Sequence, residues 1–301
     1  MSKEVGVTRA AIWKQINHLK SLGYAIDSTP RMGYRLMASP DLLLPEEIWS
    51  RYDSKTFGQR IYYFTRVDST NVTSKKLAQE GAPHGTLVIA EEQDIGKGRL
   101  GRSWSSPRGG LWLSMILRPK LPPQDAPKLT LLTAVAVAET LRALENMQVS
   151  IKWPNDILLR GKKVCGILTE LSAEMDAINY VVIGIGLNIN NSDFSEELRE
   201  GATSVSIEKG DYFDRLHILT ELLKSFESTY IMAENHGFDE ILNRWRALCG
   251  NLGQWVKVIG RTESFEGIAI DIDNTGALLV EKDDGCVERI LSGDVSLRGK
   301  A

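Results

Sequence analysis

The fold class is decided by the stretch Ile157-Leu158-Leu159-Arg160-Gly161-Lys162-Lys163-Val164-Cys165-Gly166-Ile167-Leu168. Its two apolar runs predict strands over Ile157–Leu159 and Val164–Leu171. The four residues between them, Arg160 to Lys163, are polar and contain a glycine, which predicts a hairpin turn. A hairpin joins antiparallel strands, whereas parallel strands need a long crossover connection. The sequence therefore predicts a mixed sheet rather than a strict alternation of parallel strands and helices.

Strands and helices alternate around this hairpin, from about Leu42 to Leu248. The cluster Asp68-Ser69-Thr70-Asn71 predicts a helix start, because short polar side chains cap helix N-termini. Apolar periodicity and β-branched runs predict the other elements. The further predicted strands are Ile61–Phe64, Leu87–Glu91, Leu111–Leu117 and Tyr180–Leu187, and the predicted helices are the one that ends near Gln79, Pro127–Leu144, Tyr212–Glu234 and Phe238–Leu248. Residues 42–250 are therefore predicted to form an α/β (α+β) domain with a mixed sheet.

The composition excludes several classes of protein. The chain has 301 residues, of which 43% are hydrophobic and 25% charged, as in globular proteins with two or three folded units. A formal net charge of −3 excludes a uniformly basic nucleic-acid coat. Three scattered cysteines fit neither a disulfide scaffold nor a zinc site. With no apolar signal core after Met1 and no apolar run long enough to span a bilayer, we expect a cytoplasmic protein without membrane contact.

The first 41 residues predict a partial winged helix-turn-helix. Thr8 caps a predicted helix over Arg9–Leu22, and short strands follow at Tyr24–Ile26 and Tyr34–Leu36. We expect DNA contacts from the polar face of this helix, at Arg9, Lys14 and His18. One helix and a hairpin cannot bury the stripe Ile12, Ile16, Leu19 and Leu22, so we expect the start of the motif to be incomplete. A docking or vestigial element is the alternative.

The tail differs from the rest of the chain. A predicted linker, Gly250-Asn251-Leu252-Gly253, precedes five short β-rich runs separated by turn residues. Short strands at this spacing predict a small β-barrel over residues 251–301. The predicted strands are Val256–Ile259, Ser264–Ile272, Ala277–Glu281, Val287–Leu291 and Val295–Leu297.

A glycine-rich loop, Gly96-Lys97-Gly98-Arg99-Leu100-Gly101-Arg102, carries the most informative motif. It matches the dinucleotide pattern GxGxxG and nearly matches a phosphate loop, but both need a helix at this point. The residues that follow, Ser103 to Gly110, are typical of a loop. What remains is a loop whose backbone N–H groups and three cations suit an anion. A solvated basic loop or nucleic-acid patch is the alternative.

Two further motifs carry candidate functional groups. Lys152-Trp153-Pro154-Asn155-Asp156 places a carboxylate at a strand start, where it could hold a metal or accept an amine proton, and Lys163 follows on the other arm of the hairpin. Gly184-Ile185-Gly186-Leu187-Asn188 puts two glycines in a strand, which indicates close approach of a ligand or another backbone. A solvated lysine and a β-bulge are the alternatives.

These motifs together resemble the biotin–protein ligases, in the class that also represses the biotin operon. The resemblance covers nearly the whole chain, and the order and spacing of the motifs make it specific. It implies a catalytic α/β domain of the biotin/lipoate ligase type, a C-terminal SH3-like β-barrel and an N-terminal winged helix. One departure is Lys97, where the family usually has arginine. The charge is kept, but the planar two-pronged donor is lost.

The resemblance implies that biotin and ATP, with Mg²⁺, form biotinyl-5′-adenylate, which is then transferred to a lysine. It implies catalytic roles for Lys163, Arg99 and Asp156. The implied biotin-binding residues are Ser69, Thr70, Asn71, Gln93, Lys97, Gly98, Arg99 and Lys163. The implied ATP- and adenylate-binding residues are Arg102, Asn155, Gly184, Gly186 and Asn188. We assign no metal ligand and no role to Trp104.

The implied partners are the biotin carboxyl carrier protein of acetyl-CoA carboxylase, operator DNA and a second copy of the chain. Two other functions compete with this interpretation. A lipoate–protein ligase has a related fold, and direct binding of biotin against lipoate separates the two. A DNA-binding metabolite sensor without enzymatic activity is supported by the Arg9–Leu22 helix and the wing, and adenylate production excludes it.

Overall fold

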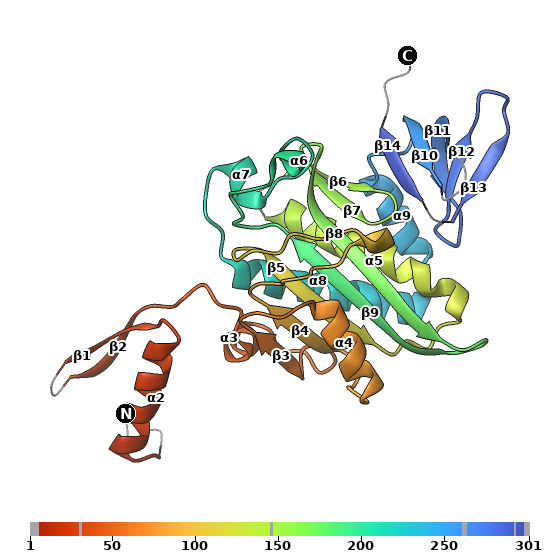
Figure 1. The fold of residues 1–301 in the computed structure, drawn as a ribbon. Coiled ribbons are helices and arrows are strands. Elements are labelled where there is room, and N and C mark those ends of the chain that lie inside the picture. The colour runs from red at the N-terminus through yellow and green to blue at the C-terminus, as the bar shows by residue number, and fades with distance from the viewer. Residues whose placement is uncertain (1–5, 30–31, 145–146, 261–263, 292, 298–301) are drawn as a thin grey trace. The chain divides into compact units, whose positions relative to one another are not determined.

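The computed structural model describes residues 6–29, 32–144, 147–260, 264–291 and 293–297. It forms two compact units, Met1–Leu42 and Leu43–Ala301 (Figure 1). The division that we predict at residue 250 lies within the second unit and stays a prediction. No helix within the described ranges is both long and apolar enough to cross a membrane.

The described part of the first unit contains helix α2 (Arg9–Ser21) and the antiparallel strands β1 (Ala25–Thr29) and β2 (Gly33–Ala38). The predicted cap is confirmed, because Thr8 Oγ1 accepts a hydrogen bond from the N–H of Ala11 at 3.2 Å. From the apolar stripe of α2, Ile16 is buried and the others are half-buried. The predicted incompleteness of the motif concerns residues before Thr8, of which residues 1–5 lie outside the described part of the chain.

The second unit is built on a mixed sheet, as predicted. Its described strands lie in the order β3-β4-β5-β9-β8-β7-β6, in which β3 and β4 are parallel and the other neighbours antiparallel. Strand β6 was not predicted. The bounds are Ile61–Phe64 for β3, Thr86–Ala90 for β4, Leu111–Leu117 for β5, Val149–Lys152 for β6, Asp156–Leu159 for β7, Lys162–Ala173 for β8 and Ile178–Leu187 for β9.

Helices cover both faces of this sheet (Figure 1). Helix α4 (Thr70–Gln79) packs on one face, where Ala78 lies in a cluster with Ile116 and Val182. On the other face lie α5 (Ala126–Ala143), α8 (Arg215–His236) and α9 (Asp239–Leu248). The prediction placed the start of α8 at Tyr212, but the helix begins at Arg215 because Asp214 caps it, accepting from the N–H of His217.

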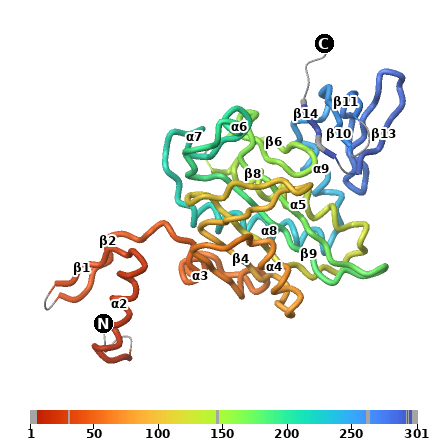
Figure 2. The backbone as a smooth tube through the Cα atoms, viewed as in Figure 1, coloured from red at the N-terminus to blue at the C-terminus, as the bar shows by residue number. Residues whose placement is uncertain are grey.

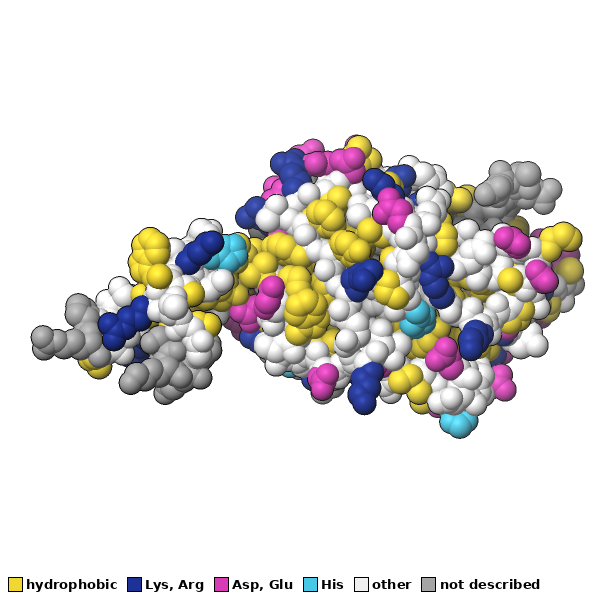
Figure 3. All heavy atoms as spheres, turned by 90° about the horizontal axis from the view of Figure 1, so that it is seen from below, with side chains coloured by type: hydrophobic (Ala, Val, Ile, Leu, Met, Phe, Trp, Pro, Cys, Tyr) yellow, Lys and Arg dark blue, Asp and Glu magenta, His cyan; other side chains and the backbone are white. Residues whose placement is uncertain are grey.

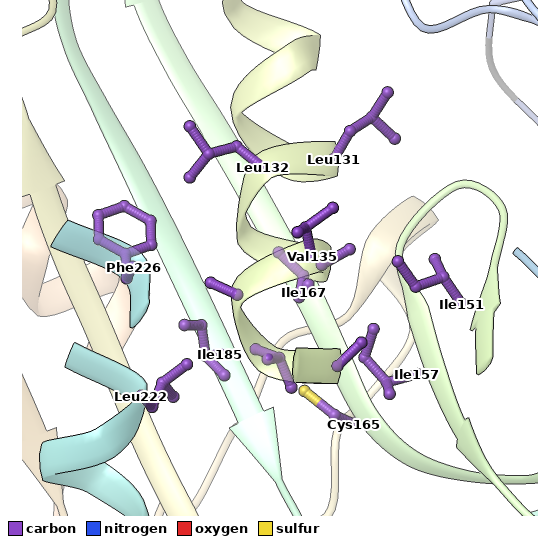
Figure 4. Close-up of a cluster of buried hydrophobic side chains, with 14 of the residues drawn as sticks. Leu131, Leu132, Val135, Ile151, Ile157, Cys165, Ile167, Ile185, Leu222 and Phe226 are labelled. Atoms are coloured by element: carbon purple, nitrogen blue, oxygen red, sulfur yellow. The ribbon is translucent and has the colours of Figure 1, made fainter. Parts of the chain in front are cut away.

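The main core lies between the sheet and helices α5 and α8 (Figure 4). Helix α5 is apolar nearly all round, as expected of a helix buried on several sides. Leu132 and Val135 of α5 belong to the same buried cluster as Ile185 of β9 and Phe226 of α8, and all four are fully or almost fully buried (Figure 4). This packing holds β8 and β9, the strands that carry the predicted site motifs, on a rigid base.

Several short helices connect these elements and were not predicted. Three are α-helical and two are 3₁₀ turns within the described residues. Their bounds are Pro45–Arg51 for α3, Glu196–Arg199 for α6, Val205–Lys209 for α7, Arg99–Gly101 for η1 and Pro123–Asp125 for η2.

The tail forms its own antiparallel sheet, at the blue end of the backbone in Figure 2. Its strands lie in the order β13-β12-β11-β10-β14, and the β-rich tail is as predicted. Their bounds are Trp255–Ile259 for β10, Ser264–Ile272 for β11, Leu278–Glu281 for β12, Val287–Ile290 for β13 and Asp294–Leu297 for β14.

Residues 250–253, which we predict to be a linker, are packed against the rest of the unit at Asn251. Asn251 is 1% exposed, and its Oδ1 accepts from the N–H of Trp153 at 2.8 Å. The indole N–H of Trp153 in turn donates to the carbonyl oxygen of Gly276 in the tail at 3.1 Å. The motif Trp153–Asp156 is therefore held by the tail from one side and by the central sheet from the other.

Candidate active site

A cavity of about 350 Å³ in the second unit is lined by every residue to which the resemblance assigns a catalytic, biotin or ATP role. They come from four stretches that are far apart in the sequence, residues 69–71, 93–102, 155–163 and 184–188. These residues are Ser69, Thr70, Asn71, Gln93, Lys97, Gly98, Arg99, Arg102, Asn155, Asp156, Lys163, Gly184, Gly186 and Asn188. The structure thus brings the candidate residues together, while their individual roles stay predictions.

A network of neutral hydrogen bonds lies at the start of α4. Gln93 Oε1 accepts from the N–H of Thr70 at 2.7 Å and from Thr70 Oγ1 at 3.0 Å, and Gln93 Nε2 donates to Ser106 Oγ at 2.8 Å. Ser114 Oγ donates to Asn71 Oδ1 at 2.7 Å. Thr70 and Asn71 are each 4% exposed. Rigid, uncharged polar groups of this kind suit a small neutral ligand group that makes several directed hydrogen bonds.

The glycine-rich loop folds back on itself beside this network. The N–H of Gly98 donates to the carbonyl oxygen of Arg102 at 2.8 Å, and that of Trp104 donates to the carbonyl oxygen of Gly96 at 2.8 Å. A side chain at residue 96 would place its Cβ 2.3 Å from the Trp104 oxygen, so this position requires glycine. Leu100 has a φ of 57°, within the left-handed region. The tight fold brings Lys97, Arg99 and Arg102 to one cavity.

Arg99 extends from this loop to two other parts of the unit. Its Nη1 donates to Asn155 Oδ1 at 2.9 Å, and its Nη2 donates to the carbonyl oxygen of Gly293 in the tail at 3.3 Å. Asn155 is in turn fixed by its Nδ2, which donates to the carbonyl oxygen of Ile167 at 2.8 Å. The loop, the Trp153–Asp156 motif and the tail therefore meet at one guanidinium group.

Lys163 stands opposite Asp156 on the β7–β8 hairpin, as the sequence predicts. Its Nζ lies 2.7 Å from Asp156 Oδ1 and 5.1 Å from the centre of the Trp104 ring. About a third of the Lys163 side chain is exposed, so the ammonium group is accessible from the cavity. A cation held by a carboxylate and an aromatic face loses less freedom when it binds an anion than one on a loose loop.

The glycines of the β8 and β9 strands make room for protein side chains. A Cβ at residue 184 would lie 2.0 Å from Asn71 Oδ1, and one at residue 186 would lie 2.4 Å from the indole nitrogen of Trp104. The close approach that the sequence predicts is therefore made by Asn71 and Trp104. Gly184 adjoins the polar network, although its predicted role is in ATP binding, whereas Gly186 lies under the indole.

Sequence reasoning missed several residues of this site. Trp104, which we left unassigned, covers Gly166 and Gly186 and lies under Lys163. A tryptophan two residues after a basic glycine loop, together with the pair of glycines in a later strand, was a signal that could have identified it. Ser114 on β5 and Glu170 on β8, two strands separated by β9, support Asn71 and carry no motif. A wall of the cavity that includes Phe194, Glu197, Leu198, Gly201 and Ala202 was also missed, since these residues have no spacing that points to a ligand.

The described residues supply this cavity with neither a cysteine thiolate nor a metal site made of three or more protein ligands. Burial raises the pKa of the Cys165 thiol, and Cys165 is fully buried, so it does not supply a thiolate nucleophile. Among the described residues, no group of three or more His, Cys, Asp or Glu side chains is placed to hold a metal ion. What the cavity offers is a neutral hydrogen-bonding end beside Lys163, Arg99 and Arg102, which suits a polar ligand that must meet a polyphosphate.

Comparison with known sequences gives the same class of protein as the fold and the cavity. The family model of the biotin/lipoate A/B protein ligases matches residues 63–188. That of the biotin protein ligase C-terminal domain matches residues 252–298, and that of an HTH domain matches residues 1–35. These matches define a ligase of the biotin/lipoate type with a DNA-binding module.

Individual relatives narrow this class. The chain is 41% identical over 300 residues to the bifunctional ligase/repressor BirA of Bacillus subtilis, covering 99% of this chain and 92% of that one. It is 33% identical over 299 residues to BirA of Escherichia coli, covering 99% and 91%. The biotin protein ligase of Aquifex aeolicus in complex with biotin and ATP superposes with a TM-score of 0.70 at 31% identity, covering 80% and 100%. The chain belongs to the biotin–protein ligase family, in its bifunctional ligase/repressor class.

Proposed function

We propose that this protein ligates biotin to a lysine of a biotin carboxyl carrier domain, with ATP as the activating substrate. The observation that carries the proposal is a single cavity in which the Thr70–Asn71–Gln93 network adjoins Lys163, Arg99 and Arg102. The ureido group of biotin has two N–H donors, which the oxygens of Thr70 and Asn71 can accept, and a carbonyl acceptor, to which the second hydrogen of Gln93 Nε2 can donate. Its carboxylate tail would then lie on the cationic side.

In the first half-reaction, a carboxylate oxygen of biotin attacks the α-phosphorus of ATP, and the bond from that phosphorus to the bridging oxygen breaks to release pyrophosphate. Two unit charges of like sign 4 Å apart repel by about 4 kcal/mol at an effective dielectric of about 20. Lys163, Arg99 and Arg102 offset this repulsion and stabilise the charge that develops on the phosphate oxygens. Trp104 and the glycine-rich loop restrict the access of water to the adenylate.

In the second half-reaction, the amine nitrogen of the carrier lysine attacks the carbonyl carbon of the mixed anhydride. The bond from that carbon to the phosphate oxygen breaks, AMP leaves, and the nitrogen loses a proton. We propose that Asp156, a carboxylate that lines the cavity, receives that proton. We propose the carrier domain of acetyl-CoA carboxylase as the acceptor, by analogy with the relative from Paracoccus denitrificans named biotin–[acetyl-CoA-carboxylase] ligase, which is 36% identical over 222 residues.

We also propose that ATP enters with Mg²⁺. Magnesium in nucleotide sites is usually held by one or two carboxylates together with substrate phosphates. Two carboxylates, those of Asp156 and Glu197, line the cavity. Asp156 and Glu197 would hold the ion, which when bound would neutralise part of the phosphate charge.

Operator binding is a second proposed function, favoured by the N-terminal unit. Arg9, Lys14 and His18 are all exposed on α2, which lies within the HTH match at residues 1–35. Basic side chains on an exposed helix, dark blue and cyan where they can be seen in Figure 3, fit the phosphates and base edges of a major groove. A homodimer on the operator is part of this proposal.

The ligase proposal is tested by incubating the purified protein with biotin, Mg²⁺-ATP and a biotin carboxyl carrier domain. Intact mass spectrometry of the carrier is expected to show one added biotinyl group, and a carrier with arginine in place of the acceptor lysine is expected to stay unmodified. Transfer of lipoate with no transfer of biotin would overturn the proposal in favour of a lipoate ligase. For the second function, we expect binding of an operator fragment that weakens as salt concentration rises, whereas binding of unrelated DNA with equal affinity would contradict it.

A further inference from the structure

Glu170, on β8 outside the cavity lining, bridges two residues of helix α4. Its Oε2 accepts from Asn71 Nδ2 at 2.9 Å, and its Oε1 lies 2.7 Å from Lys75 Nζ. Asn71 and Lys75 are one helical turn apart and therefore project from the same side of α4. Burial alone would raise the pKa of Glu170, but the hydrogen bonds from Lys75 and Asn71 outweigh it and lower the pKa, so the carboxylate is ionised at neutral pH.

From this geometry we propose that Glu170 is a positioning residue that sets the ligand preference of the cavity by fixing the orientation of the Asn71 amide. An ionised carboxylate accepts hydrogen bonds and donates none. The carbonyl oxygen of Leu168, 3.4 Å from Asn71 Nδ2, is also an acceptor. The amide nitrogen of Asn71 must therefore face Glu170, and its oxygen must face Ser114 and Gly184.

This orientation determines the hydrogen-bond direction from Asn71 through Ser114 to Thr70. Asn71 Oδ1 takes the hydroxyl hydrogen of Ser114, at 2.7 Å. Ser114 Oγ also lies 2.8 Å from Thr70 Oγ1, whose own hydrogen is directed at Ser114 or at Gln93 Oε1. The hydrogens of Asn71, Ser114 and Thr70 are thus directed at protein oxygens. What these side chains retain for a ligand is oxygen lone pairs.

Side chains that present only acceptor oxygens favour a ligand that donates hydrogen bonds. The ureido group of biotin has two N–H donors, whereas the dithiolane ring of lipoate has none. The inference rests on the proposed function, because it explains how the same site would distinguish these two acids. A neutral glutamine at residue 170 could donate to Asn71 Oδ1, which would permit the reversed amide and turn donors toward Ser114. Only the molecules that keep the original Asn71 orientation would then bind biotin, so the apparent affinity would fall.

The test compares Glu170→Gln with a matched control, Lys75→Gln, which removes the ion pair but leaves the hydrogen bond from Asn71 to Glu170. Calorimetry with biotin, and competition with lipoate as a ureido-free acid, give affinities for both variants. We expect Glu170→Gln to weaken biotin binding about tenfold, the scale of one hydrogen bond, and to leave lipoate binding within twofold. Lys75→Gln is expected to keep biotin affinity within twofold.

A double variant, Asn71→Asp with Glu170→Gln, separates orientation from packing. An aspartate at residue 71 has two acceptor oxygens, one for the amide of the introduced glutamine and one for Ser114, so the original hydrogen-bond direction returns. We expect the double variant to recover most of the lost biotin affinity.

Two results would overturn the inference. One is an equal loss of biotin affinity in Glu170→Gln and Lys75→Gln. The other is a Glu170→Gln variant that binds biotin within twofold of the unsubstituted protein. Failure of the unsubstituted protein to bind biotin would instead overturn the proposed function. If Glu170→Gln does not fold, recovery of fold and affinity in the double variant supports the inference, and its absence contradicts it.

Discussion

Lys163 Nζ lies 2.7 Å from Asp156 Oδ1, across the hairpin that joins β7 and β8. The two residues sit on adjacent strands whose register is fixed, with Asp156 paired to Gly166 and a bulge at Ile157 and Leu158. The ion pair therefore follows from the hairpin itself and needs no mobile segment. An incoming phosphate would replace the Asp156 carboxylate as the partner of the Lys163 ammonium group, which is already in place.

The first prediction concerns this lysine. Lys163→Ala is expected to raise the barrier to adenylate formation by about 2.7–4 kcal/mol, the scale of losing one preorganised charge stabiliser. Single-turnover formation of adenylate from saturating biotin and ATP measures it. Lys162→Ala, which removes an exposed lysine from the same hairpin, is the matched control and is expected to react at the unsubstituted rate. Similar rates for the two variants would exclude a direct role for Lys163.

Most of the fold was predictable from local sequence. The turn Arg160–Lys163 predicted the antiparallel neighbours, and Ile61–Phe64 was predicted with the bounds that the structure has. Strand β6 was missed because four residues, Val149 to Lys152, carry too little periodicity. The short helices α6 and α7 were missed for the same reason. Where the pattern of apolar and polar residues spans fewer than two helical turns, or only a few strand residues, it does not distinguish helix, strand and loop.

The candidate site was predicted as a set of residues but not as an arrangement. Two glycines in β9 indicated close approach, yet the sequence could not say that Asn71 and Trp104 are what approaches. Glu170 and Ser114 carry no motif, and their contact with Asn71 depends on the order of β5, β9 and β8 in the sheet. Such supporting contacts are set by tertiary packing, which one sequence does not reveal.

The contacts of Arg99 give a second prediction. Because the guanidinium joins the glycine-rich loop to Asn155 and to the carbonyl oxygen of Gly293, Arg99→Gly removes the connection that keeps the loop over the cavity. We expect adenylate to leave the site at least tenfold faster, the equivalent of about 1.4 kcal/mol. Release is measured by trapping free adenylate with hydroxylamine. Arg108→Ala, an exposed arginine paired with Glu92 nearby, is the control, and equal release from both variants would contradict the role of Arg99.

The paired glycines of β9 give a third prediction. Gly184→Ala would place a methyl group 2.0 Å from Asn71 Oδ1, and Gly186→Ala would place one 2.4 Å from the Trp104 indole nitrogen. Overpacking of this kind costs about 1–3 kcal/mol. We expect Gly184→Ala to weaken biotin binding and Gly186→Ala to weaken ATP binding in the presence of biotin. Calorimetry with each substrate measures the two affinities in each variant. If both variants lose the same affinity for biotin and for ATP, the two ends of the cavity do not bind the two substrates separately.

A buried ion pair gives a fourth prediction, on stability. Glu91 Oε2 lies 2.7 Å from Arg215 Nη2, both side chains are 2% exposed, and Glu91 Oε1 accepts from the N–H of Leu43 at 2.9 Å. Glu91→Ala leaves a buried guanidinium without its carboxylate, which destabilises a fold by about 3–5 kcal/mol. Denaturant unfolding measures it. The exposed pair Lys224–Glu221 provides the control, because Lys224→Ala is expected to change the free energy of unfolding by less than about 1 kcal/mol. If Glu91→Ala changes the free energy of unfolding as little as Lys224→Ala does, the buried ion pair does not stabilise the fold in this way.

A fifth prediction concerns pH and the half-buried residue His84. Burial lowers the pKa of His84 below its ordinary 6.5, with Arg118 adding to this and Glu234 opposing it. Its Nδ1 accepts from the N–H of Arg118 at 3.0 Å, and its ring packs 5.3 Å from that of Phe57. Near and below pH 6.5, the unfolded chain therefore binds more protons at this residue than the folded protein does.

The free energy of unfolding accordingly falls as the pH drops from about 6.5 through the lower pKa of the folded state. His84→Asn keeps a hydrogen-bond acceptor for Arg118 but does not titrate in this range. We expect melting temperatures measured between about pH 5 and about pH 7.5 to fall less steeply with acidification in the variant than in the unsubstituted protein. His217→Asn, at a histidine near the start of α8 whose side chain is exposed, is the control. If the slope of His84→Asn matches that of the unsubstituted protein, the acid sensitivity arises elsewhere in the fold.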